Sequence, residues 1–140
     1  MKWTAHNLSD LDRIAREFLS HFNKNKKFAF YGDMGSGKTS LIKLLCKHME
    51  AQDTISSPTF AIINEYYSET FGTIYHMDLY RINKPEDLLQ IGFEDYLKQD
   101  AICLIEWPEI AEYFIDEDFI KISISVGKQN ERIIYELTEQ

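Results

Sequence analysis

The chain has 140 residues, a hydrophobic content of 44% and a formal net charge of −8 from 15 basic and 23 acidic side chains. This length suits one compact domain, so we expect residues 1–140 to form a single domain. The acidic balance argues against direct nucleic-acid binding, because nucleic-acid binders normally carry a basic footprint. No apolar run approaches the roughly 20 residues that span a bilayer, and the N-terminus shows no apolar signal core. We therefore expect a cytoplasmic protein with no membrane contact, in which Cys46 and Cys103 are buried, unpaired thiols in a reducing compartment.

The first part of the chain predicts a helix, a strand and a second helix. Apolar residues at helical spacing predict an amphipathic helix from about Ser9 to Phe22. The short apolar run Lys27–Tyr31 predicts a buried strand, and a second helix is expected from about Lys38 to Met49. The stretch "DTISSPTF" predicts a loop, because Pro58 disfavours helical geometry in the residue before it.

The second part predicts strands with one helical insertion. Residues 60–67 and 73–78 are expected to form an antiparallel pair of strands. Helical turns should follow from Pro85 to about residue 99, with a break at Gly92. The run "AICLIE" predicts a fully buried strand, and "FIKISISV" and "RIIYELT" predict a C-terminal β-hairpin. The predicted fold is a single α/β domain of the P-loop NTPase type, with a mixed parallel and antiparallel central sheet flanked by helices.

The stretch "YGDMGSGKTS" at residues 31–40 contains the full P-loop pattern, Gly32-x-x-x-x-Gly37-Lys38-Thr39. Its context also fits, with a buried strand before it and an amphipathic helix after it. Such a loop directs several backbone N–H groups at phosphate oxygens, at a helix N-terminus whose dipole favours anions. Lys38 is expected to contact the β- and γ-phosphates, and the Thr39 hydroxyl to ligate Mg²⁺. The sequence therefore predicts a nucleoside triphosphate site whose contacts come from Asp33, Met34, Gly35, Ser36, Gly37, Lys38, Thr39 and Ser40.

Two acidic residues at strand ends could orient the magnesium. Glu106 ends "AICLIE", the shape of a Walker B element, and Asp78 ends "TIYHMD" in the same way. We expect both strands to flank the P-loop strand, since ligands gather at the carboxyl ends of strands in such sheets. Lys38, Asp78 and Glu106 are thus the candidate catalytic residues, and Thr39, Asp78 and Glu106 the candidate metal ligands. His76 lies on the same strand face as Asp78, where it could assist the site or simply be satisfied within the sheet.

Four further residues are candidates for sensing the nucleotide or a partner. Thr59 or Ser57 could sense the γ-phosphate, as a threonine does in GTPases, although a rigid proline turn is an equal alternative. Trp107 could cover the phosphates, stack on a partner or belong to the core. Arg81 could clamp an anion or contact a partner, with a surface salt bridge as the alternative.

ATP is favoured over GTP as the nucleotide. The segment Asn83–Asp87 ("NKPED") resembles a guanine-reading motif but follows the wrong strand, and "LYR" after Asp78 lacks the glycine of the GTPase D-x-x-G. A small-molecule kinase is one alternative, although the four arginines, at positions 13, 16, 81 and 132, form no lid cluster. A nucleotide-gated adaptor without obligatory hydrolysis is another.

Four motifs, "GDMGSGKTS", "SSPTFAIINEYY", "YHMDLYRI" and "AICLIEWPE", occur in this order with short spacers. Together they resemble the TsaE family (older name YjeE), small bacterial P-loop ATPases required for threonylcarbamoyladenosine (t6A) modification of tRNA. The resemblance implies that residues 35–39 hold the ATP phosphates and that Thr39 and Glu106 bind Mg²⁺. It also implies that Asp78 supports the metal or hydrolysis, that residues 57–59 respond to the nucleotide, and that Trp107 lies beside the site.

The resemblance further implies partners. The family works with TsaB and with TsaD, which carries the transfer chemistry; TsaE docks on TsaD and hydrolyses ATP to reset the complex between turnovers. The tRNA would then be contacted only indirectly, which agrees with the acidic charge. We expect an ATP hydrolase that is weak alone and stimulated by its partners. Met34 and Ser36 stand where family members often carry Leu and Ala, and Leu11 stands where many carry a threonine near the adenine.

Overall fold

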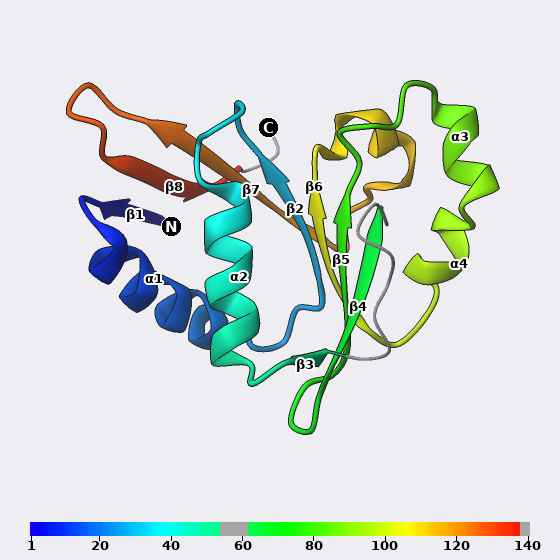
Figure 1. Ribbon diagram of the computed structural model, residues 1–140, viewed down its shortest axis with the longest axis horizontal. Coiled ribbons are helices and arrows are strands. Elements are labelled where there is room, and N and C mark those ends of the chain that lie inside the picture. The colour runs from blue at the N-terminus through cyan, green and yellow to red at the C-terminus, as the bar shows by residue number, and fades with distance from the viewer. Residues whose placement is uncertain (54–61, 138–140) are drawn as a thin grey trace.

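The computed structural model describes residues 1–53 and 62–137 (Figure 1). Its helices are α1 (Leu8–His21), α2 (Lys38–His48), α3 (Pro85–Gln90), α4 (Phe93–Leu97) and the 3₁₀ helix η1 (Pro108–Phe114). Its strands are β1 (Lys2–Ala5), β2 (Lys27–Tyr31), β3 (Gln52–Asp53), β4 (Ile63–Ser68), β5 (Gly72–Asp78), β6 (Ile102–Glu106), β7 (Phe119–Val126) and β8 (Arg132–Glu136).

The strands form one sheet in the order β1-β8-β7-β2-β6-β5-β4-β3. Its centre is parallel, because β7, β2, β6 and β5 pair in the same direction. Both flanks are antiparallel: β8 and β1 extend the sheet beyond β7, and β4 and β3 extend it beyond β5. The predicted mixed sheet is therefore confirmed.

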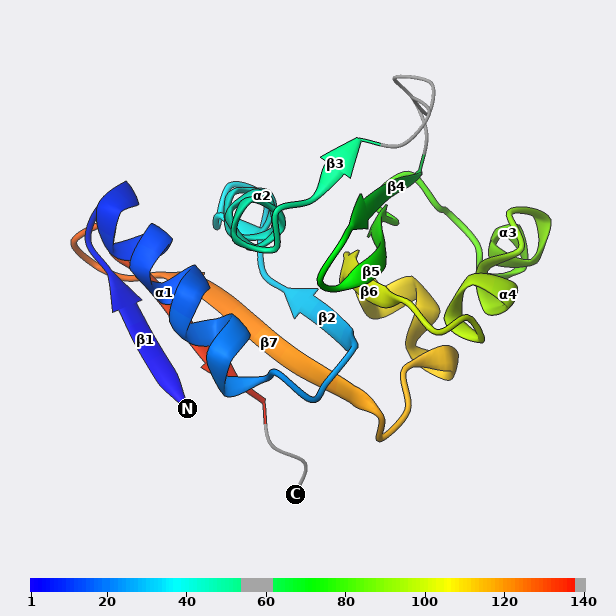
Figure 2. The same cartoon turned by 90° about the horizontal axis from the view of Figure 1, so that it is seen from below.

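The two faces of the sheet carry separate apolar cores. Helices α1 and α2 cover one face, and α3, α4 and η1 lie against the other (Figures 1 and 2). Strand β2 serves both cores, because successive side chains of a strand point to opposite faces. Phe28 and Phe30 pack in the α1–α2 core, whereas Ala29 between them packs in the other. This double burial explains why β2 is apolar without interruption from Phe28 to Tyr31.

Most predicted elements are confirmed within a residue or two, and the helix signals explain why. The Asn7 side chain accepts a hydrogen bond from the Asp10 N–H at 2.8 Å and so caps α1. Pro85 opens α3 at its first turn, and Gly92 separates α3 from α4 with a left-handed φ of 71°. The C-terminal hairpin forms from β7 and β8. Strands β1 and β3 and the helix η1 were not predicted.

One expectation about the sheet is wrong. Strand β6, which ends at Glu106, is a neighbour of β2, but β5, which ends at Asp78, pairs with β6 instead. The segment that contains α3 and α4 forms a crossover that places β6 between β5 and β2. The register still sets Asp78 opposite Glu106, so both acids meet at one edge.

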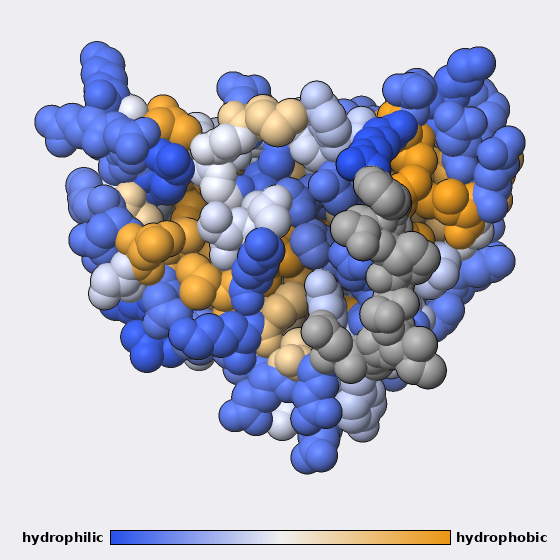
Figure 3. All heavy atoms as spheres, in the orientation of Figure 1, coloured by the Kyte–Doolittle hydropathy of each residue, from blue (hydrophilic) through white to orange (hydrophobic). Residues whose placement is uncertain are grey.

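The face shown in the surface view is largely polar (Figure 3). Apolar residues come to this face mainly where α1 meets α2 and beside α3 (Figure 3). Among the described helices, none is both long and apolar enough to cross a membrane.

Candidate nucleotide site

The P-loop connects the end of β2 to the first turn of α2. Gly35 and Gly37 adopt left-handed φ angles of 80° and 110°, which side chains with a Cβ rarely tolerate. Gly37 is the N-cap of α2, so the unpaired N–H groups of the first helical turn point toward the loop. The pattern of glycines thus has a direct conformational cause.

A cavity of about 300 Å³ lies at the mouth of this loop. It brings together residues from the P-loop, from the start of α2 and from the ends of β5 and β6 with the turns that follow them: Met34, Gly35, Ser36, Gly37, Lys38, Thr39, Ser40, Asp78, Tyr80, Glu106 and Trp107. Of the predicted phosphate contacts, only Asp33 does not line it. The catalytic and metal candidates from three separate segments of the sequence therefore share one cavity.

Lys38 is the cation of this cavity and is buried, with 5% of its surface exposed. Its ammonium donates to the carbonyl oxygen of Gly32 and lies 3.5 Å from the centroid of the Trp107 ring. Burial lowers the pKa of Lys38, and nearby acids, Glu106 foremost, oppose that shift. The side chain is thereby held against the P-loop, on the wall of the cavity.

Glu106 is the buried acid of the cavity, with 2% of its surface exposed. The Thr39 hydroxyl donates to its Oε1 at 2.7 Å, and Nε2 of His76 lies 2.6 Å from its Oε2. Burial alone would raise the pKa of Glu106, but the hydrogen bonds from His76 and Thr39 and the charges of His76 and Lys38 bring it below its usual value. Both carboxylate oxygens are thus engaged, and the group is held in its ionised form.

Asp78 lies beside Glu106 but is exposed. Its Oδ1 accepts a hydrogen bond from the Tyr80 N–H at 3.1 Å, which orients the carboxylate at the end of β5. Asp78 therefore offers a solvated second carboxylate on the wall of the cavity, next to the buried one.

Trp107 forms part of the cavity wall and also packs against the apolar core beneath α3, α4 and η1. It adopts a left-handed conformation with φ 55° and ψ 54°, directly before Pro108 opens η1. Such a conformation is unfavourable by about 1–2 kcal/mol for a residue with a Cβ, so surrounding contacts must maintain it. The Tyr80 ring at 5.1 Å and the Lys38 ammonium are such contacts. The ring thus lies over the Lys38 ammonium and against the core at once, and a role as a cover over the phosphates stays a prediction.

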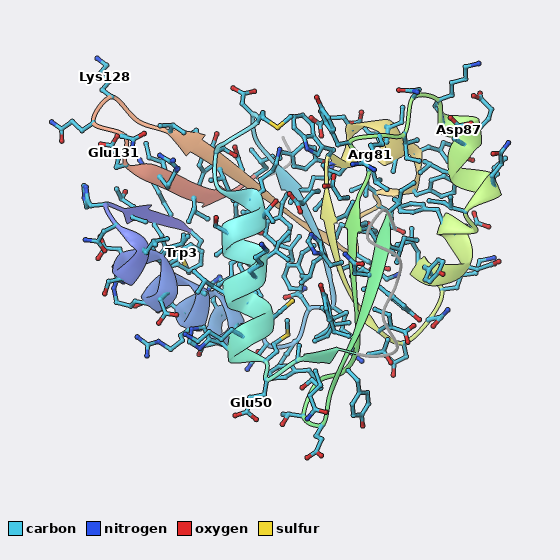
Figure 4. The ribbon with its side chains drawn as sticks, viewed as in Figure 1. Trp3, Glu50, Arg81, Asp87, Lys128 and Glu131 are labelled. Carbon is cyan, nitrogen blue, oxygen red and sulfur yellow. The ribbon has the colours of Figure 1, made fainter. Side chains whose placement is uncertain are left out.

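Arg81, Ser57, Thr59 and Leu11 remain to be placed. Arg81 is exposed in the segment that follows β5, near α3, and does not line the cavity (Figure 4). Ser57 and Thr59 lie outside the described residues, so their expected role stays a prediction. Leu11, at the position where many family members carry a threonine, is buried in the α1–α2 core.

Arg132 lies beside the P-loop, although its sequence context marked it only as one of four arginines that form no lid cluster. Nε of Arg132 lies 3.7 Å from the position that a Cβ on Gly37 would occupy, so its guanidinium flanks the P-loop. Nη1 of Arg132 donates to the backbone and side-chain oxygens of Asn130 at 2.8 and 3.1 Å. No local signal in the sequence could reveal this, because the β7–β8 hairpin reaches the loop only through the sheet.

The residues present fit a nucleotide and a magnesium ion. The described residues hold no group of three or more His, Cys, Asp or Glu that could bind a metal by itself. Mg²⁺ next to phosphates is normally held by one or two protein ligands together with phosphate oxygens and water, and Thr39 with Glu106 provides that kind of donor set. The Ser36 hydroxyl is buried without a partner among the described residues, as expected of a loop that closes around a polar ligand. Neither cysteine fits the role of a metal ligand, because burial raises the pKa of both Cys46 and Cys103 to about 11 and so keeps the thiols protonated.

Comparisons with known proteins give the family. The family model described as "Threonylcarbamoyl adenosine biosynthesis protein TsaE" matches residues 5–134. A TsaE protein of Rickettsia felis is 34% identical over 129 residues, which are 91% of this chain and 74% of that protein. One of Haemophilus influenzae is 37% identical over 110 residues (77% and 69%), and one of Bacillus subtilis is 30% identical over 135 residues (96% and 83%).

A comparison with solved structures supports the same family. The crystal structure of YdiB from Bacillus subtilis superposes with a TM-score of 0.73 at 27% identity, over 96% of this chain and 82% of that one. The P-loop cavity, the shared fold and the relatives lead to one conclusion: the chain belongs to the TsaE family of threonylcarbamoyladenosine biosynthesis proteins.

Proposed function

We propose that this protein is a Mg²⁺-dependent ATPase that acts with TsaD and TsaB in the t6A modification of tRNA. The observation that carries the proposal is the contact between the Thr39 hydroxyl and Glu106 at the foot of the P-loop. The hydroxyl proton points at the carboxylate, so the oxygen lone pairs of Thr39 are left for a cation. A P-loop threonine and a Walker B acid in contact are the parts that P-loop NTPases use for this purpose.

Phosphate binding would depend on the loop backbone and Lys38. Residues 35–39 line the cavity, so their backbone N–H groups would bind phosphate oxygens, and the ammonium of Lys38 would move from its present contacts to the β- and γ-phosphates. Bound Mg²⁺ would neutralise charge that develops on the phosphates during transfer. Glu106 would hold that cation directly or through water, and Asp78 would help to orient the attacking water.

The nucleotide is proposed to be ATP. The segment that resembles a guanine-reading motif does not line the cavity, since Lys84 caps α3 and Pro85 and Asp87 belong to that helix. Competition binding with ATP and GTP tests this point, and we expect ATP to bind more tightly.

Low activity in isolation and stimulation by a partner are also proposed. No arginine lines the cavity among the described residues, and Arg132 lies on the hairpin side of the loop. An arginine supplied to the transition state can raise turnover by about 10³- to 10⁵-fold. In this proposal TsaD provides the missing stimulation, the protein resets the TsaD–TsaB complex after each turnover, and tRNA is contacted only through that complex. Ser57, Thr59 and Arg81 are proposed to respond to the nucleotide or the partner.

The test is ATP turnover by the chain alone and with TsaD and TsaB. We expect turnover to rise when the partners are added, and equal rates would contradict the proposal. Glu106→Ala tests whether hydrolysis is required, because it removes the acid and leaves the P-loop backbone and Lys38 in place. If this variant stops hydrolysis but sustains tRNA modification in the reconstituted system, the protein is a nucleotide-gated adaptor. Transfer of labelled phosphate to a metabolite would instead identify a kinase.

A further inference from the structure

We infer that His76 is a positioning residue, which fixes the Glu106 carboxylate in the orientation needed to hold the nucleotide's cation. The inference rests on the proposed binding of Mg²⁺ and ATP, and it assigns a role to a residue that the sequence left open. His76 would contact neither the nucleotide nor the metal. It would act entirely through Glu106.

The position of His76 is set by the pairing of β5 and β6. In the parallel register His76 lies opposite Leu104, and Asp78 lies opposite Glu106. His76 is therefore one strand over and two residues back from the buried acid, on the same face of the sheet as Asp78. From there its ring reaches Glu106, with Nε2 at 2.6 Å from Oε2.

The chemistry of the contact between His76 and Glu106 shows which atom carries the proton. An ionised carboxylate can only accept hydrogen bonds, so Nε2 of His76 carries the hydrogen in this contact. Thr39 donates to the other oxygen, Oε1. With one donor on each oxygen, the plane of the carboxylate is fixed, and Oε1 remains directed at the residue that would bind the cation.

Burial makes this arrangement more than a surface ion pair. The side chains of His76 and Glu106 are 11% and 3% exposed. A second pair of the same type, His48 and Asp12, joins α2 to α1 at 2.9 Å, with exposures of 19% and 29%. The two pairs share their chemistry, but only the first contacts the P-loop, through Thr39. His48 therefore provides a matched control within the same chain.

Residues that orient a metal ligand typically contribute about 10- to 100-fold to metal affinity. Without the His76 donor, the Glu106 side chain could rotate about its own bonds and leave Thr39. The predicted consequence is specific: the tightening of ATP binding by Mg²⁺ should shrink, whereas metal-free binding, which depends on the loop backbone and Lys38, should remain.

The experiment compares ATP affinity with and without magnesium. Calorimetry gives the Kd of the wild-type chain, His76→Phe, His76→Gln and His48→Phe in excess Mg²⁺ and in EDTA. We expect His76→Phe, which keeps a ring and removes the donor, to lose about 10-fold or more of the gain that Mg²⁺ provides. Its Kd in EDTA should stay within about twofold of the wild type. His76→Gln restores a donor and should recover part of the gain, and His48→Phe should behave as the wild type.

An unchanged magnesium gain in His76→Phe would overturn the inference, as would an equal loss of affinity in EDTA, which would show general damage to the loop. If His76→Phe does not fold, the comparison passes to His76→Ala and His76→Gln. If Mg²⁺ tightens ATP binding less in His76→Ala than in His76→Gln, the inference is supported. If Mg²⁺ tightens binding equally in both variants, the inference is overturned. A wild-type chain that binds no ATP in Mg²⁺ would instead defeat the proposed function itself.

Discussion

The P-loop cavity and the α1–α2 core lie next to each other but are built on opposite principles. Four polar or charged side chains are buried among the described residues, and three of them, Ser36, Lys38 and Glu106, belong to the cavity. The α1–α2 core contains only apolar side chains in its buried set, with Phe18 at its centre. Burying a charge is unfavourable unless it is paired, whereas burying an apolar ring is favourable in itself.

The contrast shows where stability and function separate in this protein. The core supplies the free energy that holds β2 and α2 in place. The cavity uses part of that free energy to keep a cation, an acid and a hydroxyl together out of water. Changes to the core should therefore mainly alter stability and leave binding intact, and changes to the charged groups of the cavity should mainly alter binding.

The largest effect on stability is expected from Phe18→Ala. Phe18 is fully buried and contacts the rings of Phe22 and Phe28 at 4.8 and 5.3 Å. Its loss should lower the free energy of unfolding by about 3–5 kcal/mol, measured by urea denaturation. ATP affinity of the folded protein should be unchanged. Leu8→Ala, on the exposed side of the same helix, is the control and should stay within about 0.5 kcal/mol.

Lys38→Ala should have the largest effect on binding. A hydrogen bond to a charged group contributes about 1.5–3 kcal/mol, so the Kd for ATP should rise by about 10- to 100-fold in calorimetry. Lys47→Ala removes an exposed lysine from the other end of α2 and should have no effect. Equal losses in both variants would show that only net charge matters, and the contrast between the two regions would fail.

Trp107→Leu tests the cover over Lys38. A cation–π contact is worth about 0.5–2 kcal/mol, and phosphate must compete with it for the ammonium. Removing the ring should therefore tighten ATP binding by about 2- to 30-fold. Tryptophan fluorescence provides a second measurement, since ATP should change the emission of Trp3→Phe, which retains Trp107, and not that of Trp107→Leu. A fluorescence change that persists in Trp107→Leu would assign the signal to Trp3.

The smallest effect is expected from Ser36→Ala. The Ser36 hydroxyl is buried with no partner among the described residues, and such a group is unfavourable in the nucleotide-free protein. Its removal should raise the free energy of unfolding by about 1 kcal/mol in urea denaturation. Ser40→Ala, at an exposed position on α2, should change it by less than about 0.5 kcal/mol. A loss of stability in Ser36→Ala would show that the hydroxyl contributes to folding.

The local parts of this protein could be predicted from its sequence. The P-loop, the helix that follows it, the acid at the end of β6 and the C-terminal hairpin each depend on residues close together in the chain. Glycines set the loop conformation, Asn7 and Pro85 set helix starts, and alternation sets the strands. These signals act over one or two turns, so a single sequence is enough to recognise them.

The contacts between segments could not be predicted in the same way. β1 has four residues and no clear alternation, and it is a strand because β8 offers it an edge to pair with. The insertion of β6 between β5 and β2 corrected the expected strand order. The contacts of His76 with Glu106 and of Arg132 with the P-loop were also beyond prediction, because both residues come from strands whose order and register are set only by the folded sheet.

The sequence by itself determined that a phosphate loop with a lysine and a threonine would stand at the start of α2, and which acids were available to it. The tertiary structure alone decided that His76 and Thr39 would hold the two oxygens of Glu106, that Trp107 would cover Lys38, and that Arg132 would flank Gly37. The physical reason is range: backbone conformation follows from neighbouring residues, whereas side chains from distant segments meet only once the sheet has fixed which strands are adjacent and in what register.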